Sequence, residues 1–467
     1  MSDLATLPAT EQARLIRTRR ASPVEVVRAV LDRIAAWEPR LNAFAVLDAE
    51  RALEAARAAE AAAMGDDELG PLHGVPVTVK DITAVAGLPT RRGSRLTDPT
   101  PMGHDSPVVA RLKGAGGIIL GKTTATEYGW TAVSSSPLTG HTHNPWKHGV
   151  TAGGSSSGAA ALAGAGCGAL HLGTDGAGSI RLPAHFCGAV GHKPTFGLVP
   201  YAPVTNNQSL SHAGPITRTV ADAALILEVM SGLHPSDHTT LPGGFRAGDV
   251  GPADLRGLRI AYSPDLGHAR VDPDVAAAVR AAVAAFAEAG ARVEEVSPPW
   301  GPKGPGLERD LWGVAMLPFA EEDPARRAQQ DPGLAACLAE YGTMTLAQAI
   351  AAQGKRIAYA AEIGDWFASG WDLLVTPAAS VTAFEVGRQR PAHWPDHVWD
   401  WLVWAEFSYP FDLSHGAAVS VPCGRDGQGL PIGLQIAGPR CADALVLRAA
   451  AAFLAARPFA PGFASLD

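Results

Sequence analysis

The 467-residue sequence contains few cysteines, and their pattern indicates neither a disulfide framework nor a thiolate metal site. The five cysteines are an odd number, are widely spread and include no CxxC pair. A reducing cytoplasm fits this usage best. His141, His143 and His148 lie close together in the sequence, but their spacing matches no common zinc motif and no HExxH is present. We therefore expect neither a metal nor a cofactor.

Long apolar runs and an excess of basic residues are also missing. No run of about 20 apolar residues occurs, so we expect no membrane span, and the N-terminus lacks the apolar segment of a signal peptide. The net charge is −8, from 38 basic and 46 acidic residues. This balance argues against a nucleic-acid surface as the main function. What the chain does have is 47% hydrophobic residues, enough for a large buried core.

Apolar strand patterns alternate with helical patterns along most of the chain. This alternation predicts the α/β class, as one large domain with a large sheet. Residues 1–65 are predicted to form an N-terminal helical segment packed on the core, with a capping box at Ser22. Residues 66–467 are predicted to form the α/β/α domain itself. A stretch around 298–353 has no clear pattern, and we interpret it as a variable insertion or a lid.

The stretch 151–197 holds two serine clusters in glycine-rich surroundings, at Ser155–Ser157 and at Ser179. Glycine permits tight turns that leave backbone N–H groups free beside a serine hydroxyl. Such a turn can hold a nucleophile and an oxyanion together. Two glycine-rich loops around a packed helix are the plainer alternative. Upstream, Lys80 ends a short apolar strand, where burial would allow it to act as a base at neutral pH.

Four ordered motifs, PLHGVPVTVKD, GKTTATEYG, AGGSSSGAAAL and GTDGAGSIRLPAHFCGAVGHKPT, resemble the amidase signature family of serine hydrolases. The resemblance covers most of the chain apart from roughly 235–370 and the N-terminal helices. It implies a central, mostly mixed β-sheet flanked by helices. It also implies an amidase that cleaves carboxylic amide bonds other than peptide bonds through an acyl-enzyme.

The resemblance also implies a role for individual residues. It places the nucleophile at Ser179, the bridging serine at Ser155, after a cis peptide bond from Gly154, and the general base at Lys80. A hydroxyl both donates and accepts, so Ser155 can relay a proton from Ser179 to Lys80. The oxyanion hole corresponds to the N–H groups of Gly176, Ala177, Gly178 and Ser179. The residues that orient this triad correspond to Ser156, Asp175 and Arg181.

The motifs also depart from the family pattern. Ala177 stands where the family has the first of two glycines, and its Cβ would narrow the hole or change its backbone angles. Ser157 and Ala152 are further departures, and none of the three removes a triad residue.

Two assignments stay open at this point. The aromatic residues Tyr128 and Trp130, together with Tyr201 and Phe196, are candidates to line a pocket for an aryl or alkyl acyl group, with core packing as the alternative. The segment Gly154–Gly158 also fits G-x-S-x-G, which would make Ser156 an elbow nucleophile. That interpretation needs a histidine, and His212 or His415 would have to supply it.

The sequence supports two functional hypotheses. The first is a stand-alone hydrolase of amides, with aryl acylamides, esters or carbamates (urethanes) as further substrates because all share an acyl carbonyl. The second is a glutaminase-type subunit of a tRNA-dependent amidotransferase, since related enzymes use this domain to supply ammonia to a partner. The acidic charge favours the first. We thus expect a small-molecule amide, ester or carbamate substrate, no nucleic-acid or membrane partner, and a monomer or homodimer.

Overall fold

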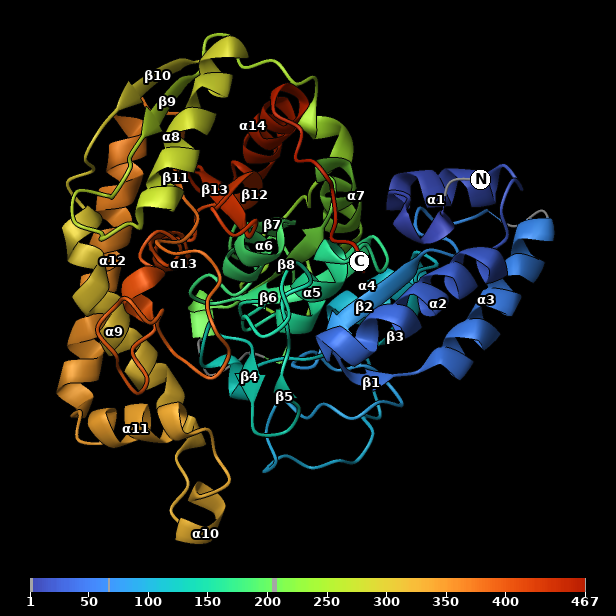
Figure 1. The fold of residues 1–467 in the computed structure, drawn as a ribbon, viewed down its shortest axis with the longest axis horizontal. Helices are drawn as coiled ribbons and strands as arrows, with labels where there is room; N and C mark the ends of the chain where they lie inside the picture. The colour runs from blue at the N-terminus through green and yellow to red at the C-terminus, as the bar shows by residue number, and fades with distance from the viewer. Residues whose placement is uncertain (1–2, 66–67, 204–207, 467) are drawn as a thin grey trace.

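A computed structural model describes residues 3–65, 68–203 and 208–466. Its centre is an 11-stranded sheet with the strand order β1-β3-β2-β6-β8-β7-β12-β13-β11-β9-β10. The strands are β1 Phe44–Leu47, β2 Pro76–Lys80, β3 Ile118–Thr123, β6 Leu170–Asp175, β7 Val190–Lys193, β8 His212–Thr217, β9 Arg259–Tyr262, β10 Arg292–Glu295, β11 Leu373–Pro377, β12 Ala418–Arg425 and β13 Pro431–Ala437. Figure 1 shows the sheet crossing the molecule from β10 at the upper left to β1 at the lower right.

The sheet is mixed, which confirms the predicted fold class. Strand β2 runs parallel to both β3 and β6, whereas β8 runs antiparallel to β6 and to β7. A separate two-stranded ribbon consists of β4 Ser135–Ser136 and β5 Gly140–His141. The predicted strand that ends at Lys80 is present as β2, and all five of its residues are buried.

Helices cover both faces of the sheet. The α-helices of the described residues are α1 Ala9–Arg17, α2 Pro23–Leu41, α3 Ala49–Met64, α4 Pro107–Gly114, α5 Ser157–Gly164, α6 Arg181–Cys187, α7 Val220–Met230, α8 Pro273–Glu288, α9 Gly304–Met316, α10 Pro324–Arg327, α11 Pro332–Tyr341, α12 Leu346–Ala368, α13 Pro410–Leu413 and α14 Asp443–Ala456. On one face, α4, α7, α8 and α14 share a core with Val77 and Leu172. On the other, α2, α5 and α6 share a core with Ile118 and Leu120. The result is three layers, helix–sheet–helix.

The N-terminal segment differs from the prediction because it is not helical throughout. Helix α2 begins at the predicted capping box of Ser22 and Glu25, and it ends at Asn42, which adopts a left-handed conformation with φ +52°. Helix α3 begins after Asp48, whose carboxylate accepts from the N–H of Arg51. Four of the five residues between these caps, Phe44–Leu47, form β1 and pair with β3 at the edge of the sheet. Four residues are too few for sequence periodicity to reveal a strand.

Two further stretches contain more regular structure than their sequences indicate. The segment 159–172, between the two serine clusters, contains both a helix and the start of a strand: α5 ends at Gly164, and Leu170 begins β6. Residues 298–353 contain α9, α10, α11 and the start of α12, and α10 projects at the bottom of Figure 1. In the described parts of the chain, no helix is long and apolar enough to cross a membrane. All five cysteines are free thiols.

Candidate active site

The candidate site lies at the carboxyl ends of two parallel neighbours, β2 and β6. Lys80 is the last residue of β2, and Asp175 is the last residue of β6. The glycine-rich loop that follows β6 carries Ser179 and leads into α6. In sheets with parallel strands, ligands bind outside the carboxyl ends of the strands. The fold therefore brings the predicted lysine and the predicted nucleophile to the same edge.

Lys80 is fully buried, and its ammonium group has only hydroxyl and carbonyl partners. Its Nζ lies 2.7 Å from Ser155 Oγ, 2.8 Å from Thr174 Oγ1 and 3.3 Å from the Thr174 carbonyl oxygen. Burial lowers the pKa of Lys80 to about 7, against an opposing effect of the Asp175 carboxylate. A substantial fraction of this amine is thus neutral, and able to accept a proton, at neutral pH.

Ser155 and Ser179 line the same small cavity. It has a volume of about 30 Å³ and is also lined by Tyr128, Gly176 and Tyr201. The peptide bond between Gly154 and Ser155 is cis, as the family resemblance implies. The structure therefore places Lys80, Ser155 and Ser179 around one site, with the lysine behind Ser155.

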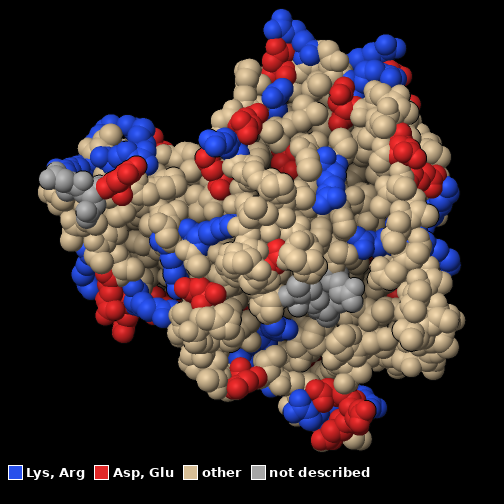
Figure 2. Space-filling view, turned by 180° about the vertical axis from the view of Figure 1, so that it is seen from behind, with Lys and Arg blue, Asp and Glu red and all other residues tan. Residues whose placement is uncertain are grey.

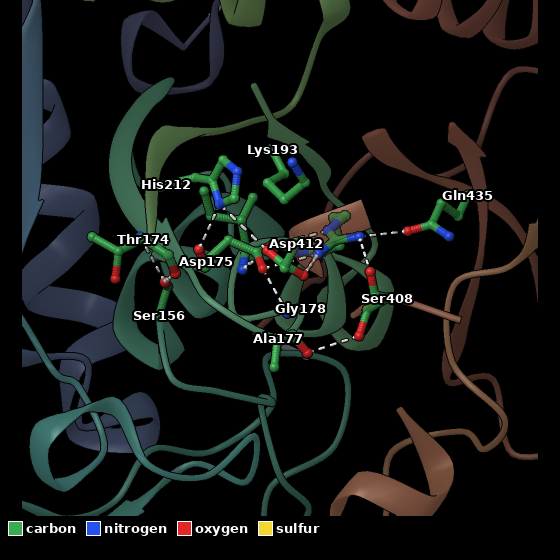
Figure 3. A network of polar contacts seen from close by, with 12 residues as sticks. Ser156, Thr174, Asp175, Ala177, Gly178, Lys193, His212, Ser408, Asp412 and Gln435 are labelled. Atoms are coloured by element: carbon green, nitrogen blue, oxygen red, sulfur yellow. Dashed lines mark hydrogen bonds and ion pairs between the residues drawn. The ribbon is translucent and has the colours of Figure 1, made fainter. Parts of the chain in front are cut away.

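The Asp175 carboxylate holds the loop that carries Ser179. Its Oδ1 accepts from the N–H of Gly178 at 2.5 Å, and its Oδ2 accepts from the N–H of Ile180 at 3.1 Å (Figure 3). This corrects the prediction for Gly178, because its N–H group is already occupied and is not available to an oxyanion. The N–H groups of Gly176, Ala177 and Ser179 have no acceptor among the described residues.

The two residues before Ser179 are tightly packed. Gly178 has φ +112°, and a Cβ at this position would lie 2.4 Å from Ser408 Oγ, so only glycine fits. Ala177 has no such constraint: its φ is not positive, and it is buried in the core with its carbonyl oxygen accepting from Ser408 Oγ at 2.7 Å (Figure 3). The departure at Ala177 is therefore accommodated without a left-handed backbone.

Arg181 joins Asp175 to a second buried carboxylate, Asp412 of α13. Arg181 donates to Asp175 from Nε at 2.9 Å and from Nη2 at 3.0 Å, and Nη2 also donates to Asp412 Oδ2 at 2.5 Å. Burial alone would raise the pKa of Asp175, but Arg181 outweighs it and holds that pKa below its usual range. Burial raises the pKa of Asp412. His212 adjoins both groups, with Nδ1 3.2 Å from the Asp175 carbonyl oxygen.

Replacing Arg181 by methionine is expected to destabilise the fold. The substitution leaves the Asp175 carboxylate buried without its cation, and breaking such a pair typically costs about 3–5 kcal/mol of unfolding free energy. Urea denaturation followed by circular dichroism measures the loss. Arg256→Met is the matched control, because Arg256 and its partner Asp254 form an exposed pair. Equal stability of the two variants would show that the Arg181 pair contributes nothing beyond an exposed one.

The aromatic candidates separate into two groups. Tyr128 and Tyr201 line the cavity. Trp130 does not: it is fully buried, and its carbonyl oxygen accepts from the indole N–H of Trp312 at 2.9 Å. Phe196 likewise stacks on a histidine, His415, with ring centroids 4.3 Å apart. Trp130 and Phe196 are therefore packing residues in this structure.

Several residues of the site carry no signal in the sequence. Trp312 of α9 and Phe319 line the cavity although both fall in the stretch without a clear pattern, and Phe319 stacks on Tyr128 with centroids 4.0 Å apart. Thr174 lies in the motif that carries Ser179, but nothing in the sequence marks its hydroxyl as a partner of Lys80. The remaining contributors to the Arg181 network are Ser408, Asp412 and Gln435.

The structure does not support the elbow interpretation of Ser156. Its Oγ donates to the Thr174 carbonyl oxygen at 3.1 Å and accepts from the Thr174 N–H at 3.2 Å (Figure 3). Neither His212 nor His415 contacts this hydroxyl: His212 faces Asp175, and His415 contacts Arg356 and Ser209. Ser156 instead joins its own turn to the strand before Ser179.

No group of three or more His, Cys, Asp or Glu residues in the described ranges is placed to hold a metal ion.

The sequence of this chain matches a known protein family. The family model described as Amidase matches residues 25–305 and 331–447. The chain belongs to the amidase signature family. As a member of the amidase signature family, it is an enzyme that hydrolyses carbon–nitrogen bonds. The family match leaves out residues 306–330, which include both Trp312 and Phe319.

Relatives within the amidase signature family include two kinds of protein. An acylamidase from Rhodococcus erythropolis is 38% identical over 471 residues, covering 98% of this chain and 97% of the relative. A glutamyl-tRNA(Gln) amidotransferase subunit from Salinispora arenicola is 35% identical over 496 residues, covering 99% of each chain. Among solved structures, a bacterial aryl acylamidase superposes with a TM-score of 0.89 at 27% identity, covering 97% of this chain and 96% of that one.

Proposed function

We propose that this enzyme hydrolyses small-molecule amides through an acyl-enzyme on Ser179, with Ser155 as proton relay and Lys80 as general base. One observation carries the proposal. The Nζ of Lys80, with its pKa lowered to about 7, lies 2.7 Å from the hydroxyl of Ser155, which shares a cavity with Ser179. A serine hydroxyl is a weak nucleophile until a base removes its proton.

In the proposed acylation step, Ser179 Oγ attacks the amide carbonyl carbon. Its proton passes to Ser155 Oγ as the Ser155 proton passes to neutral Lys80 Nζ, so Ser155 remains a neutral hydroxyl and the proton ends on Lys80. The N–H groups of Gly176, Ala177 and Ser179 are the candidates to stabilise the negative oxygen of the tetrahedral intermediate. The proton then returns through Ser155 to the amine nitrogen, and the C–N bond breaks.

In the proposed deacylation step, water attacks the Ser179 ester. The same relay accepts a proton from the water and returns one to Ser179 Oγ, which releases the carboxylic acid. Esters and carbamates present the same acyl carbonyl to the nucleophile, so we include them as further substrates. The aromatic side chains of Tyr128, Tyr201, Trp312 and Phe319 around the nucleophile suit an aryl or alkyl group. The likeness to an acylamidase and to an aryl acylamidase supports this class of substrate.

The alternative is a glutaminase-type subunit of a tRNA-dependent amidotransferase. The 35% identity to a glutamyl-tRNA(Gln) amidotransferase subunit supports this alternative. Two observations favour the stand-alone amidase. The net charge of the chain is −8, and on the face shown in Figure 2 basic and acidic side chains are interspersed rather than gathered into a basic tract. Nucleic-acid surfaces instead concentrate lysine and arginine on one face.

We expect the isolated chain to hydrolyse simple anilides, with no stimulation by tRNA. The test is a panel of anilides, primary amides, esters, carbamates and glutamine, each assayed with and without tRNA. Gel filtration in parallel reports the oligomeric state. Activity confined to glutamine, or dependent on added tRNA, would reverse the assignment in favour of the tRNA-dependent amidotransferase.

A further inference from the structure

A second cavity adjoins the one that contains the two serines. It has a volume of about 170 Å³, and Ile82, Arg92 and Tyr201 line both cavities. Most other residues around it are apolar, including Ala84, Met102, Val108, Pro200 and Ala202. The 30 Å³ cavity at Ser179 holds little more than the group that reacts, so the rest of a substrate has to extend elsewhere. The adjoining cavity, which is mostly apolar, can accommodate that part of the substrate. One cation, Arg92, lies where this cavity meets the cavity at Ser179.

The backbone holds Arg92 in an unusual conformation. Its φ is +50°, in the left-handed region that side chains rarely adopt, and its N–H donates to the Asp81 carbonyl oxygen at 2.9 Å. Tyr128, with φ +51°, donates its own N–H to the Arg92 carbonyl oxygen at 2.8 Å. A backbone hydrogen bond thus joins two strained non-glycine residues, and both residues line the cavity at Ser179. Such strain persists where the surroundings enforce it and clusters at functional sites.

The guanidinium of Arg92 has no partner among the described residues. It is half-buried, yet it makes neither an ion pair nor a hydrogen bond with any residue that the structure describes. The other lining residue with a permanent charge is Asp175, whose carboxylate is occupied by Arg181 and by backbone N–H groups. Within the described ranges, the two cavities therefore present one uncommitted cation. A guanidinium has a planar arrangement of N–H donors that matches a carboxylate in a bidentate manner.

We propose that the substrate carries a carboxylate, bound by Arg92, on a hydrocarbon part that extends from the reacting amide into the adjoining apolar cavity. This inference rests on the proposed function. It narrows the substrate class to amides whose acyl or amine part bears a carboxylate a few carbons from the amide bond. Arg92 would then be a specificity-determining residue that takes no part in the bond-breaking step.

Kinetics with paired substrates test the proposal. For the acyl side, p-nitroanilides of succinic, glutaric and adipic acid are compared with alkanoyl p-nitroanilides that have a terminal methyl in place of the carboxylate. For the amine side, N-acetyl-p-aminobenzoate is compared with N-acetyl-p-toluidine. On one of the two sides, we expect kcat/KM to favour the carboxylate about 10- to 100-fold, the range for hydrogen bonds to a charged group.

Arg92→Met should reduce that preference to about onefold and leave kcat/KM for the neutral partner within about threefold. Arg92→Lys should keep part of the preference, because an ammonium group retains the positive charge but not the planar pair of N–H donors. Arg95→Met is the matched control: Arg95 is an exposed cation close by in the chain that lines neither cavity, so the preference should not change. The neutral substrate is the internal check that each variant is folded.

Failure of this inference differs from failure of the proposed function. If neutral anilides are hydrolysed but carboxylates are not preferred on either side, or if Arg92→Met keeps the wild-type ratio, the Arg92 proposal is overturned and the amidase proposal stands. If no anilide is hydrolysed, the proposed function fails, and binding alone decides the site. In the wild type, adipate should then raise Tm more than hexanoate does, and this difference should disappear in Arg92→Met. If adipate and hexanoate raise the Tm of the wild type equally, or if the difference persists in Arg92→Met, the Arg92 proposal is overturned.

Discussion

Replacing Ser179 by alanine is expected to lower kcat for a simple anilide by about 10⁴-fold or more. Removing the nucleophile of a serine hydrolase leaves only binding and oxyanion stabilisation, and losses of this size are typical. Substrate binding should change little, because the cavity loses a single oxygen atom. Burst kinetics with an activated ester, together with steady-state rates, measure both the acylation step and turnover.

Ser157→Ala provides the matched control for Ser179→Ala. Ser157 is also a buried serine of the same glycine-rich stretch, and its hydroxyl has no partner among the described residues. Its replacement should leave kcat within about threefold, since a surplus hydroxyl contributes little. A fluorophosphonate adduct mapped by peptide mass should lie on Ser179. An adduct on Ser156, or a Ser179→Ala variant that turns over at nearly the wild-type rate, would end the assignment.

Lys80 is expected to impose a pH dependence on the reaction. Its pKa is lowered to about 7 by burial, so the amine is protonated and inactive as a base below that pH and neutral above it. The kcat/KM of the wild type should therefore rise as pH increases through about 7 and then level off. Lys80→Met should lose about 10²- to 10⁴-fold of the rate above pH 7, the range for removal of a general base.

Two further variants sharpen the Lys80 test. Lys80→Arg keeps the cation but cannot release its proton, so it should be as inactive as Lys80→Met at every pH. Lys113→Met removes a partly exposed lysine that pairs with Asp105 away from the site, and it should retain the wild-type profile. Were Lys80→Met to show an unchanged inflection near pH 7, the titrating group would have to be another residue.

Much of the fold could be predicted because its signals are local. The Ser22 capping box and the alternating valines before Lys80 each depend on residues adjacent in the chain. Strand β1 was not predictable in this way, because four residues gain their strand character only from pairing with β3. Helices α9 and α11 were missed for a similar reason: their apolar side chains pack around tryptophans from distant segments, so no single apolar stripe marks them.

The candidate site likewise contains residues that local sequence motifs reveal and others that only the three-dimensional fold reveals. Lys80, Ser155 and Ser179 lie in motifs that the sequence displays, and the structure brings them to one edge of the sheet. The occupied N–H of Gly178 was not predictable, because it depends on which way the Asp175 carboxylate turns. Trp130 lies two residues from Tyr128, yet the left-handed backbone at Tyr128 places the two rings in different surroundings. Arg92 has no motif at all, and only the shape of the two cavities identifies it.

The cavity at Ser179 has walls of two different origins. Tyr128 comes from the part of the chain that matches the family, whereas its stacking partner Phe319, and Trp312 nearby, come from residues 306–330, which do not match. Residues 306–330 could therefore be replaced during evolution, and the substrate range could change, without any change to the strands of the sheet. In such an architecture the reaction chemistry and the substrate specificity reside in different parts of the chain. A protein engineer could then alter specificity by substituting residues in one short segment.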